Sequence, residues 1–332
     1  MKRSGTFAAI VVATLLWGAS TPGVRANDSI GDTALGGLTL VKSEAISMDS
    51  EDLFISRDQV RVRYQFTNTS NAPIDALVVF PLPEIPPGNE GGEEDAVYWG
   101  DAKTDLAFHT SFDGQPLALQ LVEQALLGGR DVSARLNALG VPLNRFSKRF
   151  EPSIAALQKP ERDRLVAEKL IVNGGDDAHP SWNGLWALRT LLTRRQIFPA
   201  QKTVVVEHDY KPLAGEAVGP SPQYPDTGDF KRGRAKYCID DEWLRGFGTL
   251  LQKQKKNANA TEIFLGYVLK TGANWKGPIK DFHLVVDKGK PESLVSFCAE
   301  GVKKISPTQF EAHYSNFTPT KDLDILIVDW PR

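Results

Sequence analysis

The sequence has little of what most catalytic sites need. Among 332 residues there are two cysteines and five histidines. Neither cysteine lies in a protease signature, and the sequence contains no GxSxG elbow, P-loop or dinucleotide-binding fingerprint. Two cysteines and scattered histidines do not make a zinc site. The sequence therefore gives no catalytic, cofactor or metal residue, and it favours a protein that is not an enzyme.

An excess of positive charge is also absent. The chain has 39 Lys and Arg against 41 Asp and Glu, which gives a formal net charge of -2. Without a basic stripe, nucleic acid is not expected as a partner. Beyond the N-terminus, no apolar run is long enough to cross a bilayer, so we expect no transmembrane segment in the mature chain.

The first 26 residues differ from the rest and predict a secretory signal peptide. Lys2 and Arg3 provide a positive start, Phe7–Trp17 is a short apolar run, and small residues lead to a cleavage point after Ala26. The alternative is an N-terminal membrane anchor. No cysteine follows the cut, which excludes lipid attachment there. We therefore expect a periplasmic or secreted protein.

In an exported protein the two cysteines can form a disulfide. Cys238 and Cys298 are the only pair available, and disulfides persist in oxidising compartments. The alternative is two buried free thiols. A bond would close a loop of about 60 residues and stabilise the fold by roughly 4 kcal/mol in the chain-entropy model. We predict that the two residues are joined.

The N-terminal part of the mature chain alternates with a period of two. In residues 60–67, apolar and polar side chains take turns, as expected for a half-buried strand. The polar cluster 68–73 predicts a turn, and 74–82 a second strand that pairs with the first as a hairpin. Pro81 and Pro83 lack N–H donors, so we expect them to end that strand.

The middle of the chain has a different pattern. Residues 120–195 are predicted to hold three or four helices, one of them placing Trp182 and Trp186 near one face. After residue 195 we expect a strand, a long loop at 213–233 and a helix capped by Asp240. The last third is again rich in strands.

These patterns predict a mainly β fold, an antiparallel β-sandwich that is α+β overall. The sandwich would be one discontinuous domain, residues 27–119 and 196–332, with a helical insertion at 120–195. Because a sandwich uses its inward faces for the core, binding surfaces are expected in end loops and insertions. Trp182 and Trp186 are the binding residues predicted here, although both rings could instead anchor the insertion.

Several segments resemble a known family. They are VRVRYQFTN, VVFPLP, FDGQPL, LGVPLNRF, QIFPAQKTVVVEHDYKP, YVLKTGANWKGPIKDFHLVVDKG and FEAHYSNFTPTKDLDILI. In this order they resemble domain-of-unknown-function family 4424 of exported bacterial proteins, over nearly the whole mature chain. The resemblance implies an exported protein and carries no activity. Residues 60–83 are also similar to the hairpin of VIT domains, which favours a sandwich.

Three groups of polar residues have more than one interpretation. Asp240, Asp241 and Glu242, beside Trp243, suit the first turn of a helix, but a glycosidase also needs such carboxylates. The acidic loop Glu90–Asp95 could hold Ca²⁺, although its spacing fits no EF-hand. His208 lies on an apolar strand face, where a hydrogen-bonded core histidine is expected.

The sequence as a whole predicts an exported, soluble module of the periplasm or envelope that acts by binding. Its partner would be a protein or a glycan of the envelope. The alternative function is a carbohydrate-active hydrolase that uses a carboxylate pair.

Overall fold

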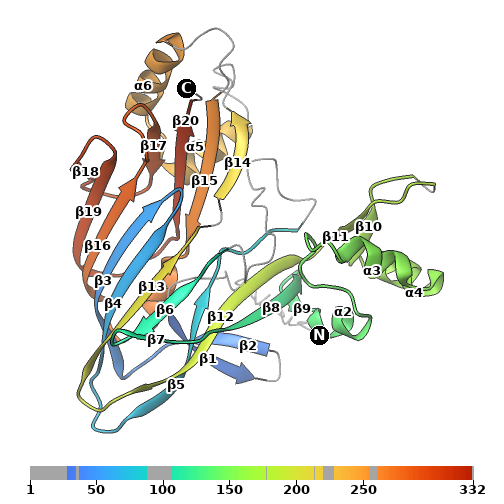
Figure 1. Ribbon diagram of the computed structural model, residues 1–332, viewed down its shortest axis with the longest axis horizontal. Coiled ribbons are helices and arrows are strands. Elements are labelled where there is room, and N and C mark those ends of the chain that lie inside the picture. The colour runs from blue at the N-terminus through green and yellow to red at the C-terminus, as the bar shows by residue number, and fades with distance from the viewer. Residues whose placement is uncertain are drawn as a thin grey trace, which may run out of the picture.

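The computed structural model describes residues 28–34, 37–87, 106–176, 178–212, 214–219, 228–253 and 260–330 (Figure 1). Over these ranges the chain is mainly β with a few helices, as predicted. The predicted signal peptide with its cleavage point after Ala26, and the acidic loop Glu90–Asp95, lie outside the described residues.

The large sheet extends along the left side of the molecule in Figure 1. Its strands form because buried and exposed residues alternate along them, as in β4, so that one face packs on the core. Among the described strands only β16 and β3 pair in parallel; the other pairs are antiparallel. In order across the sheet, the strands are β18 (Lys303–Lys304), β19 (Gln309–Phe317), β16 (Ile279–Asp287), β3 (Ile46–Ser56), β4 (Val60–Asn68), β13 (Thr203–Tyr210), β6 (His109–Phe112) and β7 (Gln115–Pro116).

Two smaller sheets complete the sandwich. The second sheet contains β2 (Gly37–Val41), β1 (Ser29–Ala34), β5 (Ile74–Pro81), β12 (Ala187–Phe198), β8 (Gln120–Leu127) and β9 (Arg130–Asp131). The third sheet contains β14 (Ala214–Gly219), β15 (Ala260–Tyr267), β20 (Leu323–Asp329) and β17 (Leu294–Phe297). A 3-10 helix, η2 (Lys270–Asn274), follows β15.

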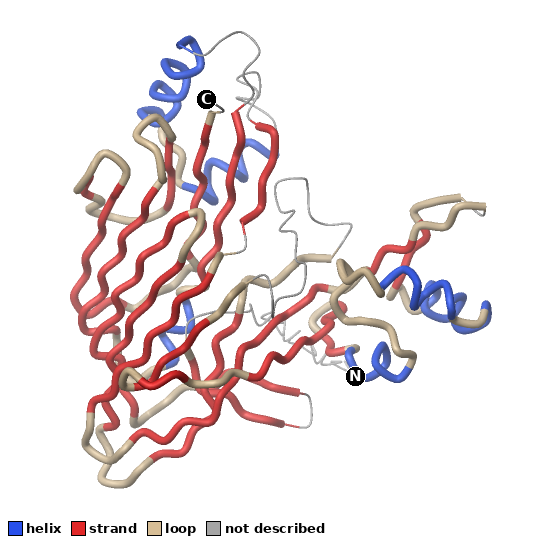
Figure 2. Tube along the Cα trace, viewed as in Figure 1, coloured by secondary structure: helices blue, strands red, loops and turns tan. Residues whose placement is uncertain are grey.

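The main core lies where the three sheets meet. Tyr64 of the large sheet, Phe80 of the second and Tyr267 of the third are all buried in one cluster. The Phe80 and Tyr267 rings lie 6.5 Å apart. A second cluster lies on the other face of the third sheet, where Phe247 of α6 contacts Trp330. The helices α5 (Gly228–Tyr237) and α6 (Asp241–Lys253) lie beside this sheet (Figure 2).

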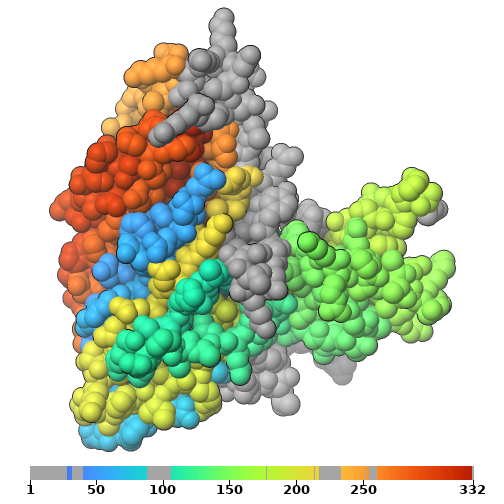
Figure 3. Space-filling model, in the orientation of Figure 1, coloured from blue at the N-terminus to red at the C-terminus, as the bar shows by residue number. Residues whose placement is uncertain are grey.

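An arm projects from the sandwich, seen at the right in Figures 1 and 3. This insert, residues 128–186, contains α2 (Ser133–Ala138), α3 (Phe150–Ala156), α4 (Lys159–Ala167) and the hairpin of β10 (Ile171–Asn173) and β11 (Trp182–Gly184). The prediction of helices throughout 120–195 is wrong at both ends, because β8 and β12 are strands of the second sheet. β12 is buried on both faces, so its apolar residues do not alternate as in a half-buried strand.

The predicted hairpin at residues 60–82 is also wrong. β4 belongs to the large sheet and β5 to the second, so the turn between them carries the chain across the core. Asn68, which is buried, holds this turn: its Nδ2 donates to the carbonyls of Ala72 and Phe198, both at 2.9 Å. β5 ends at Pro81, as predicted.

The C-terminal elements are joined covalently. Cys238 and Cys298 form a disulfide with their Cα atoms 5.1 Å apart, which ties the end of α5 to the segment after β17. The loop predicted at 213–233 instead includes β14 and the first part of α5, while 220–227 lies outside the described residues. Within the described ranges, no helix has the length and apolar character to span a membrane.

Candidate functional site

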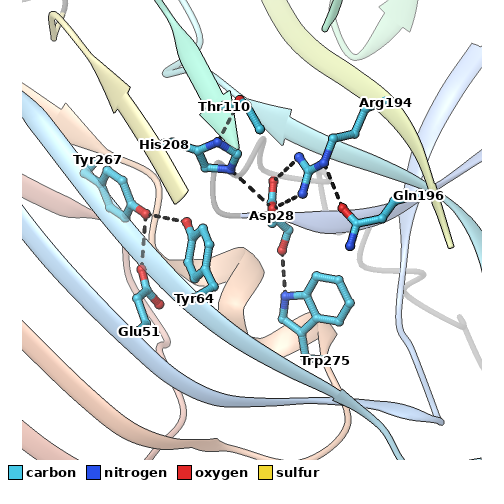
Figure 4. Close-up of polar contacts among 9 residues, drawn as sticks. All are labelled: Asp28, Glu51, Tyr64, Thr110, Arg194, Gln196, His208, Tyr267 and Trp275. Carbon is cyan, nitrogen blue, oxygen red and sulfur yellow. Dashed lines mark hydrogen bonds and ion pairs between the residues drawn. The ribbon is translucent and has the colours of Figure 1, made fainter. Parts of the chain in front are cut away.

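A buried network of charged and polar groups lies where the second sheet meets the large sheet (Figure 4). Arg194 of β12 donates from Nη2 to Asp28 Oδ2 at 2.6 Å and from Nη1 to Asp28 Oδ1 at 3.2 Å. His208 Nε2 of β13 lies 3.3 Å from the same carboxylate. The Trp275 indole N–H donates to the Asp28 carbonyl at 2.7 Å. Residues distant in the chain thus meet at Asp28.

The charges in this network are fixed by their surroundings. Burial alone would raise the pKa of Asp28, but the Arg194 guanidinium and the His208 ring hold it well below its usual range. Burial lowers the pKa of His208 in spite of Asp28. A lowered pKa favours the neutral ring at pH 7, and of its two tautomers the one with the proton on Nε2 suits the nearby carboxylate. Nδ1 then accepts the hydroxyl hydrogen of Thr110, 2.9 Å away.

A second buried network joins the large sheet to the third. The hydroxyls of Tyr64 and Tyr267 lie 2.8 Å apart, and Tyr267 donates to Glu51 Oε1 at 3.1 Å. Burial raises the pKa of both tyrosines well above the ordinary value, so their hydroxyls stay protonated. Both networks therefore hold polar groups of different sheets together inside the core.

The order Thr110, His208, Asp28 resembles the hydroxyl, imidazole and carboxylate of a nucleophilic hydrolase. Here, however, Thr110 is 7% exposed and His208 only 2%. The rings of Phe80 and Phe108 lie 5.1 and 5.3 Å from the imidazole. These rings pack against the imidazole, so the network stabilises the fold, and Thr110 and His208 at the same time line a groove on the outer face of their strands. The expectation that His208 is a hydrogen-bonded core histidine is confirmed.

The outer face of the same strands is hollowed into a groove of about 1050 Å³. Because side chains alternate along a strand, the residues between those of the core point outwards into it. β3, β4, β6, β13 and β16 contribute to its floor, and the segment after β7 forms a wall. The residues that line it are Asp52, Phe54, Arg61, Val62, Arg63, Phe108, His109, Thr110, Ser111, Pro116, Leu117, Ala118, Glu207, His208, Asp209 and Val285.

Most charged groups of the groove have a polar or charged side chain as a partner. Arg63 Nε lies 3.4 Å from Glu207 Oε1, and the two residues are opposite each other in β4 and β13. Asp209 accepts from Gln59 Nε2 at 2.5 Å. Asp52 Oδ1 lies 3.1 Å from His283 Nδ1. Each of these four groups therefore already has a partner within the protein.

Arg61 is the exception. Its guanidinium carbon lies 4.6 Å from the centre of the Phe54 ring, and its side chain is exposed. Asp209 lies opposite it in β13, but among the described residues Arg61 forms no ion pair with a carboxylate. An arginine whose guanidinium lies over an aromatic ring is partly fixed in place and suits bidentate binding of an anion. Arg61 is therefore the group in the groove that is best placed to hold an acidic ligand.

The comparison with family models gives a clear result. A model described as Domain of unknown function (DUF4424) matches residues 26–326, nearly the whole chain. The chain belongs to the DUF4424 family. This confirms the resemblance noted in the sequence. No curated protein matches the DUF4424 chain in sequence.

Two solved structures are similar to this DUF4424 chain at low levels. A candidate nutrient-binding protein from Legionella pneumophila has 14% identity and a TM-score of 0.41, with 90% of this chain and 72% of that chain covered. An M1 zinc metallopeptidase from Deinococcus radiodurans has 8% identity and a TM-score of 0.27, with 86% and 43% covered. Such TM-scores do not indicate a ligand or an activity.

The two tryptophans predicted to bind a partner do not lie on a helix. Trp186 is fully buried: its indole N–H donates to the Leu143 carbonyl at 2.8 Å, and its ring packs on Phe150. Its ring is therefore not available to a partner. Trp182 lies in β11 and is half-buried. The structure supports the alternative in which the Trp186 ring anchors the insert.

Two of the three carboxylates at 240–242 have structural partners. Asp240 Oδ1 accepts the backbone N–H of Trp243 at 2.7 Å, which confirms it as the cap of α6. Asp241 pairs with Arg234 at 2.8 Å. Trp243 donates to the Val295 carbonyl, which fixes α6 on β17. This helix start therefore gives no support to a glycosidase site.

Asp28, Arg194 and Arg61 were not predicted from the sequence as functional or structural residues. Asp28 lies two residues after the predicted cleavage point and belongs to no motif that would predict a structural role. Arg194 lies in the segment taken as a helix, and nothing in the sequence joins it to a residue 166 positions away. Arg61 was recognised only as part of the polar face of its strand. The only sign of it in the sequence was that Arg61 and Arg63 lie together on the face of β4 opposite the apolar one.

Proposed function

We propose that the protein is an exported, non-enzymatic binding module that holds an extended peptide segment of an envelope protein in the groove. Arg61, on the Phe54 ring, binds a carboxylate of that segment. The groove combines this guanidinium with acidic side chains and with an apolar wall at Pro116–Ala118. A peptide offers charged and apolar side chains in alternation, so it complements such a lining better than a uniformly polar ligand does.

The observation that carries the proposal is that Arg61 lies over the Phe54 ring and forms no ion pair among the described residues. The other charged side chains just described have a partner of their own, which reduces what they gain from a ligand. A guanidinium on an aromatic support that forms no ion pair among the described residues loses little on meeting a carboxylate, because its orientation is already set. This makes Arg61 the energetic centre of the groove.

Export is supported by two features. The first 26 residues have the pattern of a signal peptide, and the Cys238–Cys298 disulfide is a bond that persists in oxidising compartments. A binding role is favoured over the alternative carbohydrate-active hydrolase because Asp240 and Asp241 serve the start of α6, and because Thr110 and His208 are almost fully buried.

The test is site-directed photo-crosslinking of the full chain, expressed with its own N-terminus and recovered from the exported fraction. One variant carries the crosslinker at Ser111 in the groove, and a control carries it at Val172, a residue of the insert that is 40% exposed. We expect a protein crosslinked at Ser111, through a segment containing Asp or Glu, and lost with Arg61→Gln. Mass spectrometry of the same sample should give Asn27 as the N-terminus.

The reverse result would contradict the proposal. Crosslinks that form at Val172 and not at Ser111 would place the binding surface on the insert, as the sequence first indicated. A Ser111 crosslink that is unchanged by Arg61→Gln would show that the guanidinium does not bind the partner.

A further inference from the structure

A second hollow, of about 650 Å³, opens between the large sheet and the third sheet beside the disulfide. Leu284 of β16, Leu323 of β20 and Leu269 after β15 are buried residues that form its apolar floor. Cys238 and Cys298 lie on its wall. A concave site of this size, with an apolar floor, is typical of a pocket for a small molecule.

Three aromatic rings form one side of this pocket. Phe282 and Tyr314 are parallel to within 1°, with centres 6.0 Å apart. Phe317 lies 4.8 Å from Phe282 and 5.0 Å from Tyr314. Tyr314 and Phe317 are only half-buried, although both are aromatic residues beside a core. A partly exposed aromatic surface therefore lines the pocket.

The rim is polar but nearly neutral. Hydroxyl and amide groups come from Ser315, Asn316, Thr318 and Thr320. The charged residues of the rim are of both signs: Lys321, Glu300 and Asp322. The Asp322 carboxylate is already engaged, since Oδ1 accepts the Lys270 backbone N–H at 3.1 Å and Oδ2 lies 3.4 Å from Lys270 Nζ. The rim thus has many hydrogen-bonding groups and little net field, which favours a neutral ligand.

We propose that this pocket binds a neutral sugar ring. A pyranose has C–H groups on its faces and hydroxyls around its edge, so one face can lie on Tyr314 and Phe317 while the edge meets the rim. A purely apolar ligand would leave the rim groups without partners, which costs free energy. The site is separate from the groove of Arg61 and does not depend on the function proposed for it.

The disulfide supports the pocket. It fixes Cys298, and with it the neighbouring Ala299 and Glu300 of the wall, to the end of α5. Tyr314 donates from its hydroxyl to the Glu300 carbonyl at 2.7 Å, which holds this wall against β19. Reduction of the disulfide would leave the wall held by the Tyr314 hydrogen bond without the covalent attachment. We therefore expect sugar binding to weaken under reducing conditions.

The experiment is a titration of the oxidised full-length mature chain with three probes: methyl β-glucopyranoside, cellobiose and diacetylchitobiose. Saturation-transfer NMR and calorimetry detect binding at millimolar concentration. We expect at least one probe to bind and Tyr314→Ala to weaken it about tenfold, the loss expected for one aromatic contact. The matched control is His313→Ala, the next residue of β19, whose side chain pairs with Asp281 on the other face of the sheet.

Tyr314→Phe and Phe317→Leu separate the ring from its packing. Tyr314→Phe keeps the aromatic face and should bind more strongly than Tyr314→Ala, whereas Phe317→Leu, which stays apolar, should weaken binding. Circular dichroism confirms that each variant is folded. If none of the three sugars binds, or if the wild type and folded Tyr314→Ala bind equally, the proposal is wrong. Binding of indole in place of every sugar would equally overturn it. None of these results changes the outcome of crosslinking at Ser111.

Discussion

Two neighbouring arginines on β12 show how the inner and outer faces of the sandwich differ. Arg194 lies 2.6 Å from Asp28, and Arg195 lies 2.7 Å from Asp75. The Arg194 side chain is 1% exposed and that of Arg195 is 67% exposed. The distances are almost the same, but water can replace the partner of Arg195 and cannot replace that of Arg194. The same kind of contact is therefore essential inside and dispensable outside.

The large sheet repeats this contrast along single strands. On the inner faces of β4 and β13, Tyr64 and His208 have hydrogen-bond partners and join the sheets. On the outer face of β4, Arg61 is exposed and, among the residues described, has no carboxylate partner. Polar groups of the inner face specify how the sheets meet, and those of the outer face are available to a ligand. Changes on the two faces should therefore affect stability and binding separately.

The largest effect is expected at Arg194. Arg194→Met leaves the Asp28 carboxylate buried without its main partner, which should lower the free energy of unfolding by about 3–5 kcal/mol. The matched variant Arg195→Met removes an exposed pair and should change it little. Urea denaturation of both variants makes the comparison. Equal losses would show that the two faces do not differ as described.

Trp186 extends the test to the insert. Its ring is fully buried against Phe150, so Trp186→Ala should lower the free energy of unfolding by about 3–5 kcal/mol. Trp182 is half-buried, and Trp182→Ala should cost less. Thermal and urea unfolding measure both. A Trp186→Ala protein with unchanged stability would mean that the arm is not held by this ring.

The inner face should also respond to pH. Burial lowers the pKa of His208 below its ordinary 6.5, so at lower pH the unfolded chain takes up a proton that the folded chain does not. The free energy of unfolding should therefore fall below about pH 6.5, by at most about 1.4 kcal/mol per pH unit from this residue. His208→Gln should reduce that slope. The low pKa of Asp28 adds a further loss below its ordinary 3.8. Urea unfolding from pH 7 to pH 3 tests the sign: a slope that His208→Gln leaves unchanged contradicts it.

The sequence predicted what depends on local pattern. The alternation in β4, the cap of α6 at Asp240 and the Cys238–Cys298 pair were all correct, because period, capping and cysteine count can be recognised without knowing the rest of the fold. β12 was mistaken for a helix because it is buried on both faces and has lost the alternation that marks a strand.

The candidate site depended on long-range pairing, which local pattern does not show. Arg61 meets Phe54 only because β3 and β4 pair in this register. The groove adds β13 and β6, which come from other parts of the chain. The turn after β4 was expected to reverse the chain within one sheet, whereas it leads to the opposite sheet, and nothing in residues 68–73 distinguishes the two.

Arg61 gives the most direct test of the proposed function. A peptide selected against the wild-type protein from a random library is titrated by calorimetry into the wild type, Arg61→Gln and the control Arg149→Gln, which removes an exposed arginine of the insert. Since a charge-assisted hydrogen bond contributes about 1.5–3 kcal/mol, Arg61→Gln should weaken binding at least about tenfold, with stability unchanged and Arg149→Gln like the wild type. Equal affinity of Arg61→Gln and the wild type, or a loss with Arg149→Gln alone, would contradict the assignment of the groove as the binding site.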